Sequence, residues 1–331
     1  MAKIKQTIGW GIIITDSPSA DIWCKALSMS IDTRLVAVAG SDKVFLHTIA
    51  DKFGIKHCYD DVQMLFDDKD VDAVLVVTPA STHVTYAMMA MRGGKPVCVT
   101  APLSGSYDEC SRLNRVSKES GMPCFVTYYR RYMPYFAKVK SLLQSGVLGQ
   151  VLSVDMRLKA SADAFSLNTE VCESIAMVSE RDHNGLFYVV APQQLDIVQE
   201  LFGVIVKAHG YQFGSDDHDG REDALSACLR FSNGVVGNGR WIFTRHATQM
   251  EDVVEVTGSM GTLQFSVYNT QPIQLCTAKG VETFDVEDIP CPQLPFLQSM
   301  NDHIRGIGHC ECNSISATAV NWVMDRILWK V

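Results

Sequence analysis

The chain has 331 residues, a length that favours two domains over a single core. Hydrophobic residues make up 47% of it and charged residues 20%, which is the composition of an ordinary globular protein. The formal net charge of −8 argues against nucleic acid or an anionic membrane surface as a partner. No stretch approaches the ~20 consecutive apolar residues of a membrane-spanning helix.

The cysteines indicate a reducing compartment. Eleven of them are scattered without a repeating spacing, and most lie inside apolar runs such as 97–99 and 123–125. The first residues carry the positive charge of a signal peptide, but the apolar run behind them ends at Asp16 and has no small-residue cleavage site. We therefore expect a strand at this position and a cytoplasmic protein.

Strands and helices are predicted to alternate strictly through the first third of the chain. The apolar runs predict strands over 4–14, 34–39, 72–78, 96–99 and 123–127, with helices over 20–29, 43–53, 81–92 and 107–120 between them. This alternation is typical of an α/β fold, a Rossmann-like doubly wound parallel sheet, which we assign to residues 1–124. Ligands of such sheets bind at the carboxyl ends of the strands, here residues 14–17, 40–43, 78–83 and 100–102.

The pattern changes in the remainder of the chain. Helices are predicted over 134–145, 186–202, 293–306 and 314–330, with a long strand over 151–159 and mostly alternating strands from 204 to 286. Consecutive strands flanked by helices predict a second, α+β domain with a mostly antiparallel open sheet over residues 125–331.

The first strand-to-helix turn has the place of a dinucleotide-binding turn but lacks its glycines. Ile14 stands where the backbone must bend freely, and Asp16 places a carboxylate where a diphosphate would approach. At the end of the second strand, where an acid normally holds the ribose, the chain has Gly40. Asp42 lies close by, but an aspartate at a helix start more often caps the helix.

Several segments, in their order and spacing, resemble the Gfo/Idh/MocA family (glucose-fructose oxidoreductase, inositol dehydrogenase and MocA) along nearly the whole chain. They are Ile8-Gly-Trp-Gly-Ile-Ile13, Asp70-Val-Asp-Ala-Val74, Thr78-Pro-Ala-Ser-Thr-His83, Gly93-Gly-Lys-Pro-Val97, Val126 to Phe136, Ser145 to Gly149, Gln194-Leu-Asp196 and Val256 to Thr262.

This resemblance implies an NAD- or NADP-dependent oxidoreductase fold for sugars, polyols or related hydroxy compounds. It implies a sugar-like ligand, and an oligomer formed through the second-domain sheet with another copy or with an active relative. It also implies cofactor contacts at nine cleft positions: Gly11, Thr15, Ser17, Asp42, Thr78, Pro79, His83, Thr100 and Pro102.

The departures from the family pattern bear on activity. The family's Glu-Lys-Pro is replaced by Thr100-Ala101-Pro102, so the lysine that assists proton and hydride movement is lost. The family's substrate-binding aspartate and acid/base histidine align with Val189 and Gln193. Oxidation of an alcohol by hydride transfer requires a group that accepts the hydroxyl proton, and these side chains cannot do so near neutral pH.

Other candidates allow two interpretations each. His83 either lines a nucleotide site or forms hydrogen bonds at a helix start, and Arg130 and Arg131 either bind a ligand or form structural ion pairs. Asp182 and His183 are the acid–histidine pair nearest the lost catalytic positions and form either a relocated base or part of a polar loop. Tyr129 is a further candidate for displaced catalysis. His309-Cys-Glu-Cys312 lacks the paired spacing of a structural zinc site, so no metal is expected.

The coincident substitutions predict a family member that has lost its dehydrogenase activity and acts as a ligand-binding, regulatory or partner subunit. Two alternatives stay open. One is an active oxidoreductase with displaced catalytic groups, and the other is a scaffold protein without a small-molecule ligand.

Overall fold

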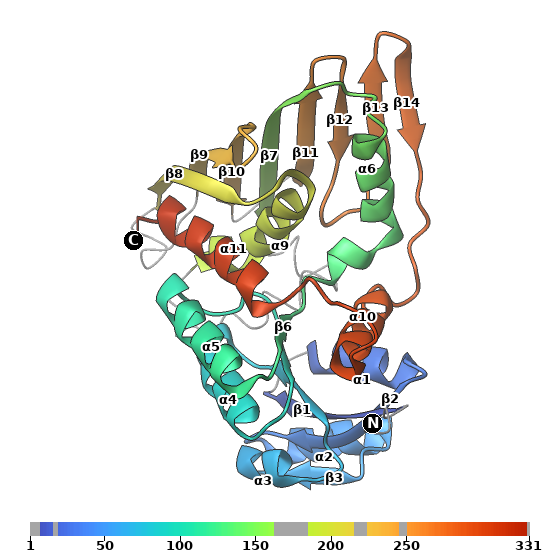
Figure 1. The fold of residues 1–331 in the computed structure, drawn as a ribbon, viewed down its shortest axis with the longest axis vertical. Coiled ribbons are helices and arrows are strands. Elements are labelled where there is room, and N and C mark those ends of the chain that lie inside the picture. The colour runs from blue at the N-terminus through green and yellow to red at the C-terminus, as the bar shows by residue number, and fades with distance from the viewer. Residues whose placement is uncertain (1–6, 16–18, 162–184, 215–223, 245–249, 330–331) are drawn as a thin grey trace. The chain divides into compact units, whose positions relative to one another are not determined.

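The computed structural model describes residues 7–15, 19–161, 185–214, 224–244 and 250–329 (Figure 1). Contacts divide these residues into two compact units, each with its own sheet. Unit 1 holds 7–129 and Gln293–Asn321, and unit 2 holds 130–292 and 322–329. The single boundary after residue 124 remains a sequence prediction, whereas by contacts residues 293–321 group with unit 1.

Unit 1 is built on a six-stranded parallel sheet, as the sequence predicts. Its order is β3-β2-β1-β4-β5-β6, so the direction of winding reverses between β1 and β4. Both of these strands are buried at every residue, as expected for a parallel sheet covered on both faces. The strands are β1 (Ile8–Ile14), β2 (Thr33–Ala39), β3 (His57–Tyr59), β4 (Ala73–Val77), β5 (Val97–Val99) and β6 (Cys124–Val126).

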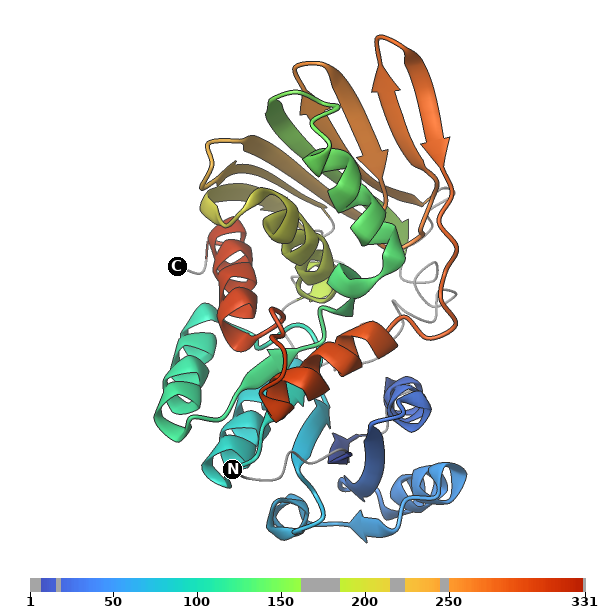
Figure 2. The same ribbon diagram turned by 45° about the vertical axis from the view of Figure 1, so that its right-hand side comes forward.

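Helices cover both faces of this sheet (Figures 1 and 2). They are α1 (Ser19–Met29), α2 (Lys43–Phe53), α3 (Val62–Asp67), α4 (Ala80–Arg92), α5 (Tyr107–Ser120) and α10 (Leu294–Arg305). Helix α1 packs against α2 and α10, and α4 packs against α5. Residue Pro79 occupies the N-cap position of α4, so the helix begins at Ala80, one residue before the predicted start; the fixed φ of proline suits a helix start.

Helix α10 returns to unit 1 from the far end of the sequence and is fixed there by polar contacts. The indole Nε1 of Trp10 donates to Oδ1 of Asn301 at 3.1 Å, although the two residues are 291 positions apart. Arg305 Nη2 lies 2.6 Å from Oδ2 of Asp32, just before β2. These side chains attach the helix to the first two strands.

Unit 2 contains an eight-stranded sheet in the order β14-β13-β12-β11-β7-β10-β9-β8. Every neighbouring pair is antiparallel except β7 and β10, which confirms the predicted mostly antiparallel sheet. The strands are β7 (Val151–Ser161), β8 (Ile205–Phe213), β9 (Ala224–Phe231), β10 (Val236–Thr244), β11 (Glu251–Gly258), β12 (Gly261–Phe265), β13 (Ile273–Thr277) and β14 (Gly280–Phe284).

One face of this sheet is covered by α6 (Pro134–Gln144) and α9 (Gly185–Phe202), as Figure 2 shows. The short η1 helix (Tyr129–Tyr132) precedes α6, and the last turns of α11 (Ser314–Ile327) belong to unit 2. Among the described elements no helix covers the opposite face. The side chains on that face are more exposed and alternate along each strand with the buried side chains of the covered face, as in β9. In the described ranges, no helix is long and apolar enough to cross a membrane.

Candidate functional site

The end of β1 is packed too closely to resemble a glycine-rich turn. Ile14 is buried, and the next residue, Thr15, donates its backbone N–H to the carbonyl of Val77 at 3.4 Å. That N–H is therefore engaged in the sheet. The remaining turn candidates, Asp16 and Ser17, lie outside the described residues.

Gly40 ends β2 in a position that has no room for a ribose-binding acid. A Cβ built on Gly40 would lie 2.3 Å from the carbonyl oxygen of Ile14, well inside van der Waals contact. Any side chain here requires a backbone shift of β1 or β2. The glycine is thus explained by the packing of the two strands.

Asp42 acts as the N-cap of α2, as its position at the helix start suggests. Its Oδ1 accepts the backbone N–H groups of Val44 and Phe45 at 2.9 and 3.0 Å. These bonds satisfy two of the four N–H groups that a helix leaves without partners at its N-terminus.

Gly11 lies in the middle of β1 rather than at the turn. It pairs with Ala37 on one side and with Val74 on the other. A Cβ at this position would meet the side chains of Leu65 and Val71 at 3.0 Å. The missing side chain therefore allows close packing within unit 1, and Gly11 does not lie among the residues at the strand ends.

His83 brings together the candidates at the ends of β4 and β5. Its Nε2 lies 2.7 Å from the carbonyl of Thr78 and 3.1 Å from Oγ1 of Thr100, and its Nδ1 lies 2.9 Å from the carbonyl of Pro102. The imidazole is 1% exposed. Of the two interpretations offered by the sequence, this geometry favours hydrogen bonding at the start of α4, next to Pro79.

Ala101 lies in the loop after β5, where the family resemblance implies a lysine. The residue is buried, and its backbone N–H donates to Oγ1 of Thr127 at 3.0 Å. The peptide bond to Pro102 is cis. The backbone of Ala101 is thus held by a threonine hydroxyl, while its methyl side chain offers no proton acceptor.

The two residues that the resemblance aligns with a family aspartate and histidine lie one turn apart on α9 in unit 2. Val189 and Gln193 are 8% and 7% exposed. The amide oxygen of Gln193 has no hydrogen-bond partner among the described residues. Such a buried acceptor is costly unless something bonds to it. The displaced-catalysis candidates Asp182 and His183 lie outside the described ranges.

Arg131 forms a buried ion-pair network within unit 2. Its Nε and Nη2 bond both oxygens of Asp196 at 2.7 and 2.5 Å, and its Nη1 lies 2.9 Å from Glu200. Burial raises the pKa of Asp196, and the attraction of Arg131 opposes that rise. The ion-pair interpretation therefore holds for Arg131, whose guanidinium ties the η1 segment to α9.

Arg130 and Tyr129 are also packed into the interior. The guanidinium of Arg130 donates to the carbonyl of Val267 at 2.8 Å and lies 5.0 Å from the ring centroid of Tyr268. Tyr129 is buried in unit 1 with its ring 6.2 Å from that of Trp23. These contacts explain both residues by packing.

One buried polar cluster was not foreseen from the sequence. Asp252 accepts the backbone N–H groups of Val267 and Tyr268 at 3.0 and 2.5 Å, and Gln194 bridges it to the indole N–H of Trp241. Burial raises the pKa of Asp252, and these N–H groups oppose the rise. The sequence did contain one indication: Asp252 alternates in phase with the apolar residues of its strand that face the core.

Among the described residues at the ends of β1 and β2, Ile14 and Gly40 serve strand packing and Asp42 caps α2. The described residues contain no group of three metal-binding side chains. The fold nevertheless defines a class: a parallel sheet in the order 3-2-1-4-5-6, followed by an antiparallel sheet domain, as in two-domain oxidoreductases of the Rossmann type.

The chain belongs to the Gfo/Idh/MocA oxidoreductase family. Residues 8–128 match the family model described as an NAD-binding Rossmann fold, and residues 136–264 match the GFO/IDH/MocA C-terminal domain.

Two relatives illustrate the likeness in sequence. Oxidoreductase P35 of Formosa agariphila is 26% identical over 325 residues, covering 97% of this chain and 98% of the relative. The scyllo-inositol 2-dehydrogenase (NAD(+)) of Bacillus subtilis is 25% identical over 286 residues, covering 85% of this chain and 79% of the enzyme.

Solved structures share the fold. Levoglucosan dehydrogenase in complex with NADH and levoglucosan superposes with a TM-score of 0.82 at 19% identity, covering 98% of this chain and 97% of that one. An oxidoreductase from Agrobacterium radiobacter in complex with NAD+, L-tartaric acid and magnesium gives 0.83 at 18% identity, covering 96% and 94%. Family and structural neighbours thus bind nicotinamide dinucleotides.

Proposed function

We propose that this chain is a Gfo/Idh/MocA homologue that has lost NAD(P)-dependent sugar or polyol dehydrogenase activity and acts as a ligand-binding, regulatory or partner subunit. The observation that carries the proposal is the coincidence of Ala101, Val189 and Gln193 at the three family positions that hold a lysine, an aspartate and a histidine. All three replacements are buried, so they belong to packed parts of the two units.

Chemistry gives the reason. Hydride transfer from an alcohol carbon needs a group that takes the hydroxyl proton, and such groups contribute ~10²–10⁴-fold to rate. The methyl group of Ala101, the isopropyl group of Val189 and the neutral amide of Gln193 cannot accept that proton. The amide of Gln193 can still hold a hydroxyl group by hydrogen bonds, so binding of a sugar-like ligand is compatible with loss of turnover.

The cofactor side supports the same conclusion. Gly40 carries no acid for the ribose, and the Asp42 carboxylate is occupied by the N-terminus of α2. Ile14 stands at a position that calls for glycine. Each of these features weakens the attraction for NAD or NADP, whichever the ancestor used.

The partner belongs to the proposal as well. The uncovered face of the unit 2 sheet carries half-exposed side chains, including Arg157 and Glu251 paired at 2.9 Å. We assign this face to contact with a second copy or with an active relative, in the cytoplasm. An uncovered face of an antiparallel sheet faces either water or another layer, and the half-buried side chains here favour another layer.

The test combines binding and turnover. Purified protein is titrated with NADH and with NADPH by fluorescence, and is then assayed with NAD+ or NADP+ on scyllo-inositol and levoglucosan. We expect binding far weaker than low-micromolar and no turnover. Low-micromolar binding together with turnover would overturn the proposal. The triple change Ala101→Lys, Val189→Asp and Gln193→His gives the matched comparison for regained activity.

A second candidate is an active oxidoreductase with displaced catalytic groups. It is favoured by the likeness to the scyllo-inositol dehydrogenase over 85% of this chain. Under this proposal His183, Asp182 or Tyr129 supplies the proton acceptor. Nucleotide should then co-purify with the protein, and His183→Ala should abolish turnover while leaving nucleotide binding intact.

A further inference from the structure

Strand β8 lies at one edge of the unit 2 sheet, and its pairing shows which of its backbone groups point outward. Phe231 of β9 donates its backbone N–H to Val235 at 2.9 Å, on the side of β10. Because backbone groups alternate in direction along an antiparallel strand, the preceding residue, Arg230, directs its N–H and carbonyl toward β8. Arg230 pairs with Lys207. The next residue of β8, Ala208, therefore directs its N–H and carbonyl away from β9.

A tryptophan covers the following outward position. By the same alternation Gly210 points away from β9, and its carbonyl accepts the indole Nε1–H of Trp329 at 2.5 Å. Ile327 meets Gly210 on the covered face of the sheet, whereas His209 lies on the uncovered face. The indole ring centroid is 4.5 Å from that of the His209 imidazole. The indole therefore lies across the edge of β8.

Trp329 holds this position in an unfavourable backbone conformation. Its φ is +58°, in the left-handed region that residues with a Cβ rarely adopt. The residue stays 60% exposed, so the contact with β8 leaves much of its apolar surface in water. Both features lower the free energy needed to move Trp329 off the edge. A strand edge with open N–H and carbonyl groups is a template for pairing with another chain.

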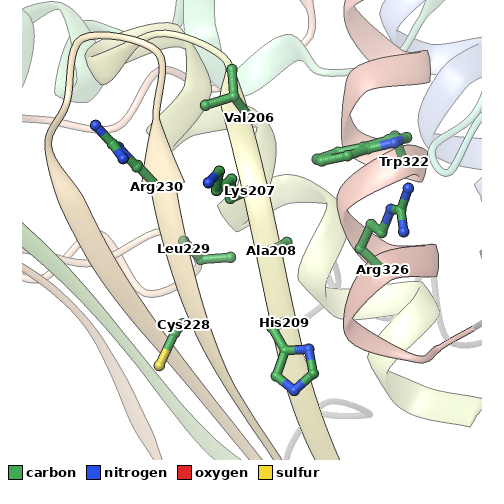
Figure 3. Close-up of a pocket in the computed structure, with 9 residues that line it drawn as sticks. All are labelled: Val206, Lys207, Ala208, His209, Cys228, Leu229, Arg230, Trp322 and Arg326. Atoms are coloured by element: carbon green, nitrogen blue, oxygen red, sulfur yellow. The ribbon is translucent and has the colours of Figure 1, made fainter.

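A groove of about 500 Å³ runs beside the same stretch of β8, between β8, β9 and the last turns of α11. Figure 3 shows Trp322 projecting from α11 toward the Val206 end of β8, with the Arg326 side chain beside it. None of the lining residues is acidic, although the whole chain carries a net charge of −8. The charges of the groove therefore favour an acidic occupant.

The two faces of the sheet differ in chemistry along this edge. Ala208 lies on the covered face, opposite the buried Leu229. Lys207 and Arg230 lie opposite one another on the uncovered face, where both are exposed and their like charges repel. An extended chain directs successive side chains to opposite faces. One added strand can therefore place apolar residues beside Ala208 and acidic residues beside Lys207.

We propose that an extended acidic segment of a partner protein adds to β8 as a further antiparallel strand and displaces Trp329 from the edge. Its backbone bonds Ala208 and Gly210, which gives affinity, and its alternating side chains give specificity. A carboxylate beside Lys207 removes the repulsion from Arg230. The edge belongs to unit 2, so the inference holds whether the chain has lost or kept dehydrogenase activity.

The probe is a heptapeptide in which glutamate and valine alternate, labelled with fluorescein at its N-terminus and amidated at its C-terminus. Fluorescence anisotropy follows its binding to the full chain. In the proposed register the valine side chains share the covered face with Ala208, so the valine N–H groups face β8 and the glutamate N–H groups face water. N-methylation of the valines should abolish binding, whereas N-methylation of the glutamates should not. The same peptide with lysine for glutamate should not bind, because it repels Lys207.

Ala208→Pro tests the edge from the side of the protein. Proline removes the outward N–H without removing a bond to β9, and edge strands tolerate proline in this orientation. We expect peptide affinity to fall roughly tenfold or more while the melting temperature stays near that of the wild type. Ala208→Ser keeps the N–H and is the matched control, with the affinity of the wild type.

Trp329→Ala tests the displacement. Removing the indole frees the carbonyl of Gly210, so peptide affinity should rise by roughly threefold to tenfold. An unchanged or lower affinity would show that the indole does not block the edge, and would overturn that part of the inference.

Three further outcomes would overturn the inference as a whole. One is the absence of peptide binding to both the wild type and Trp329→Ala at millimolar concentration. Another is equal affinity for the parent and the valine-methylated peptides, or for Ala208→Pro and Ala208→Ser, which would place the peptide on another surface. The third is a doubled mass of Trp329→Ala by light scattering without peptide binding, which would make the edge an interface between copies of this chain.

Discussion

At the scale of single residues, Gly40 shows why unit 1 has no acidic side chain at the end of β2. The position lacks an acid because the carbonyl of Ile14 occupies the space of a Cβ at 2.3 Å. His83 is a comparable case: a histidine in a matched motif is committed to the carbonyls of Thr78 and Pro102. Both positions, which the family motifs suggest for cofactor binding, are therefore explained by packing and hydrogen bonding within unit 1.

Restoring an acid at this position should destabilise the protein without restoring binding. We expect Gly40→Asp to lower the free energy of unfolding by about 1–3 kcal/mol, because β1 or β2 must shift to admit the side chain. Urea denaturation measures this, and NADH titration follows binding. Ser41→Asp, at the exposed neighbouring residue, is the control. A stable Gly40→Asp protein with tight NADH binding would contradict the packing argument.

At the scale of elements, α10 shows how a distant segment completes unit 1. Burial acts to raise the pKa of Asp32, but hydrogen bonds from Ser30, Asn301 and Arg305, together with the charge of Arg305, hold that pKa below its ordinary value of 3.8. The lowered pKa means that the ionised carboxylate stabilises the folded state. The contribution is therefore present above pH 3.8 and is lost as the pH falls through the lower folded value.

Asp32→Asn tests this attachment. We expect the variant to lose about 1–3 kcal/mol of unfolding free energy at pH 6–7, because a charge-assisted network between β2 and α10 is weakened. The difference from wild type should shrink as the pH drops below 3.8. Urea denaturation at several pH values measures it, with the capping residue Asp61→Asn as control, since Asp61 bonds only within its own short helix. A difference that grows on acidification would refute the assignment.

At the scale of the whole molecule, the uncovered face of the eight-stranded sheet determines assembly under our proposal. Val253 lies on this face of β11, opposite Arg157 of β7, and is half-buried. A second copy or an active relative would cover both residues. The face carries paired charges such as Arg157 and Glu251, which is typical of a polar interface.

Val253→Arg should dissociate the oligomer, since it places a second positive charge opposite Arg157 and adds bulk to the face. Light scattering coupled to size exclusion gives the mass. Val281→Arg, at an exposed position of the edge strand β14, is the control for a surface charge away from the centre of the sheet. An unchanged mass for Val253→Arg would move the contact to another surface.

The fold was largely predictable because most of its strands and helices have clear local patterns of apolar and polar residues. The apolar run 72–78 predicted β4 almost at its observed bounds, the helix predicted over 43–53 coincides with α2, and both sheet types are confirmed. Short elements were missed: β3 and α3 span three and six residues, too few for a periodicity to be read. The return of α10 depends on contacts between residues nearly 300 positions apart.

The sequence by itself determined the family and the order of the longer strands and helices, since these depend on residue types and local patterns. It also shows by residue type alone that Ala101, Val189 and Gln193 carry no titratable side chain. Only the tertiary structure decided what the remaining polar residues do. It assigned Asp42 to a helix cap, His83 to two carbonyls and Arg131 to Asp196. It also paired Lys207 with Arg230, because strand register, which brings distant charges together, is not encoded in either segment alone.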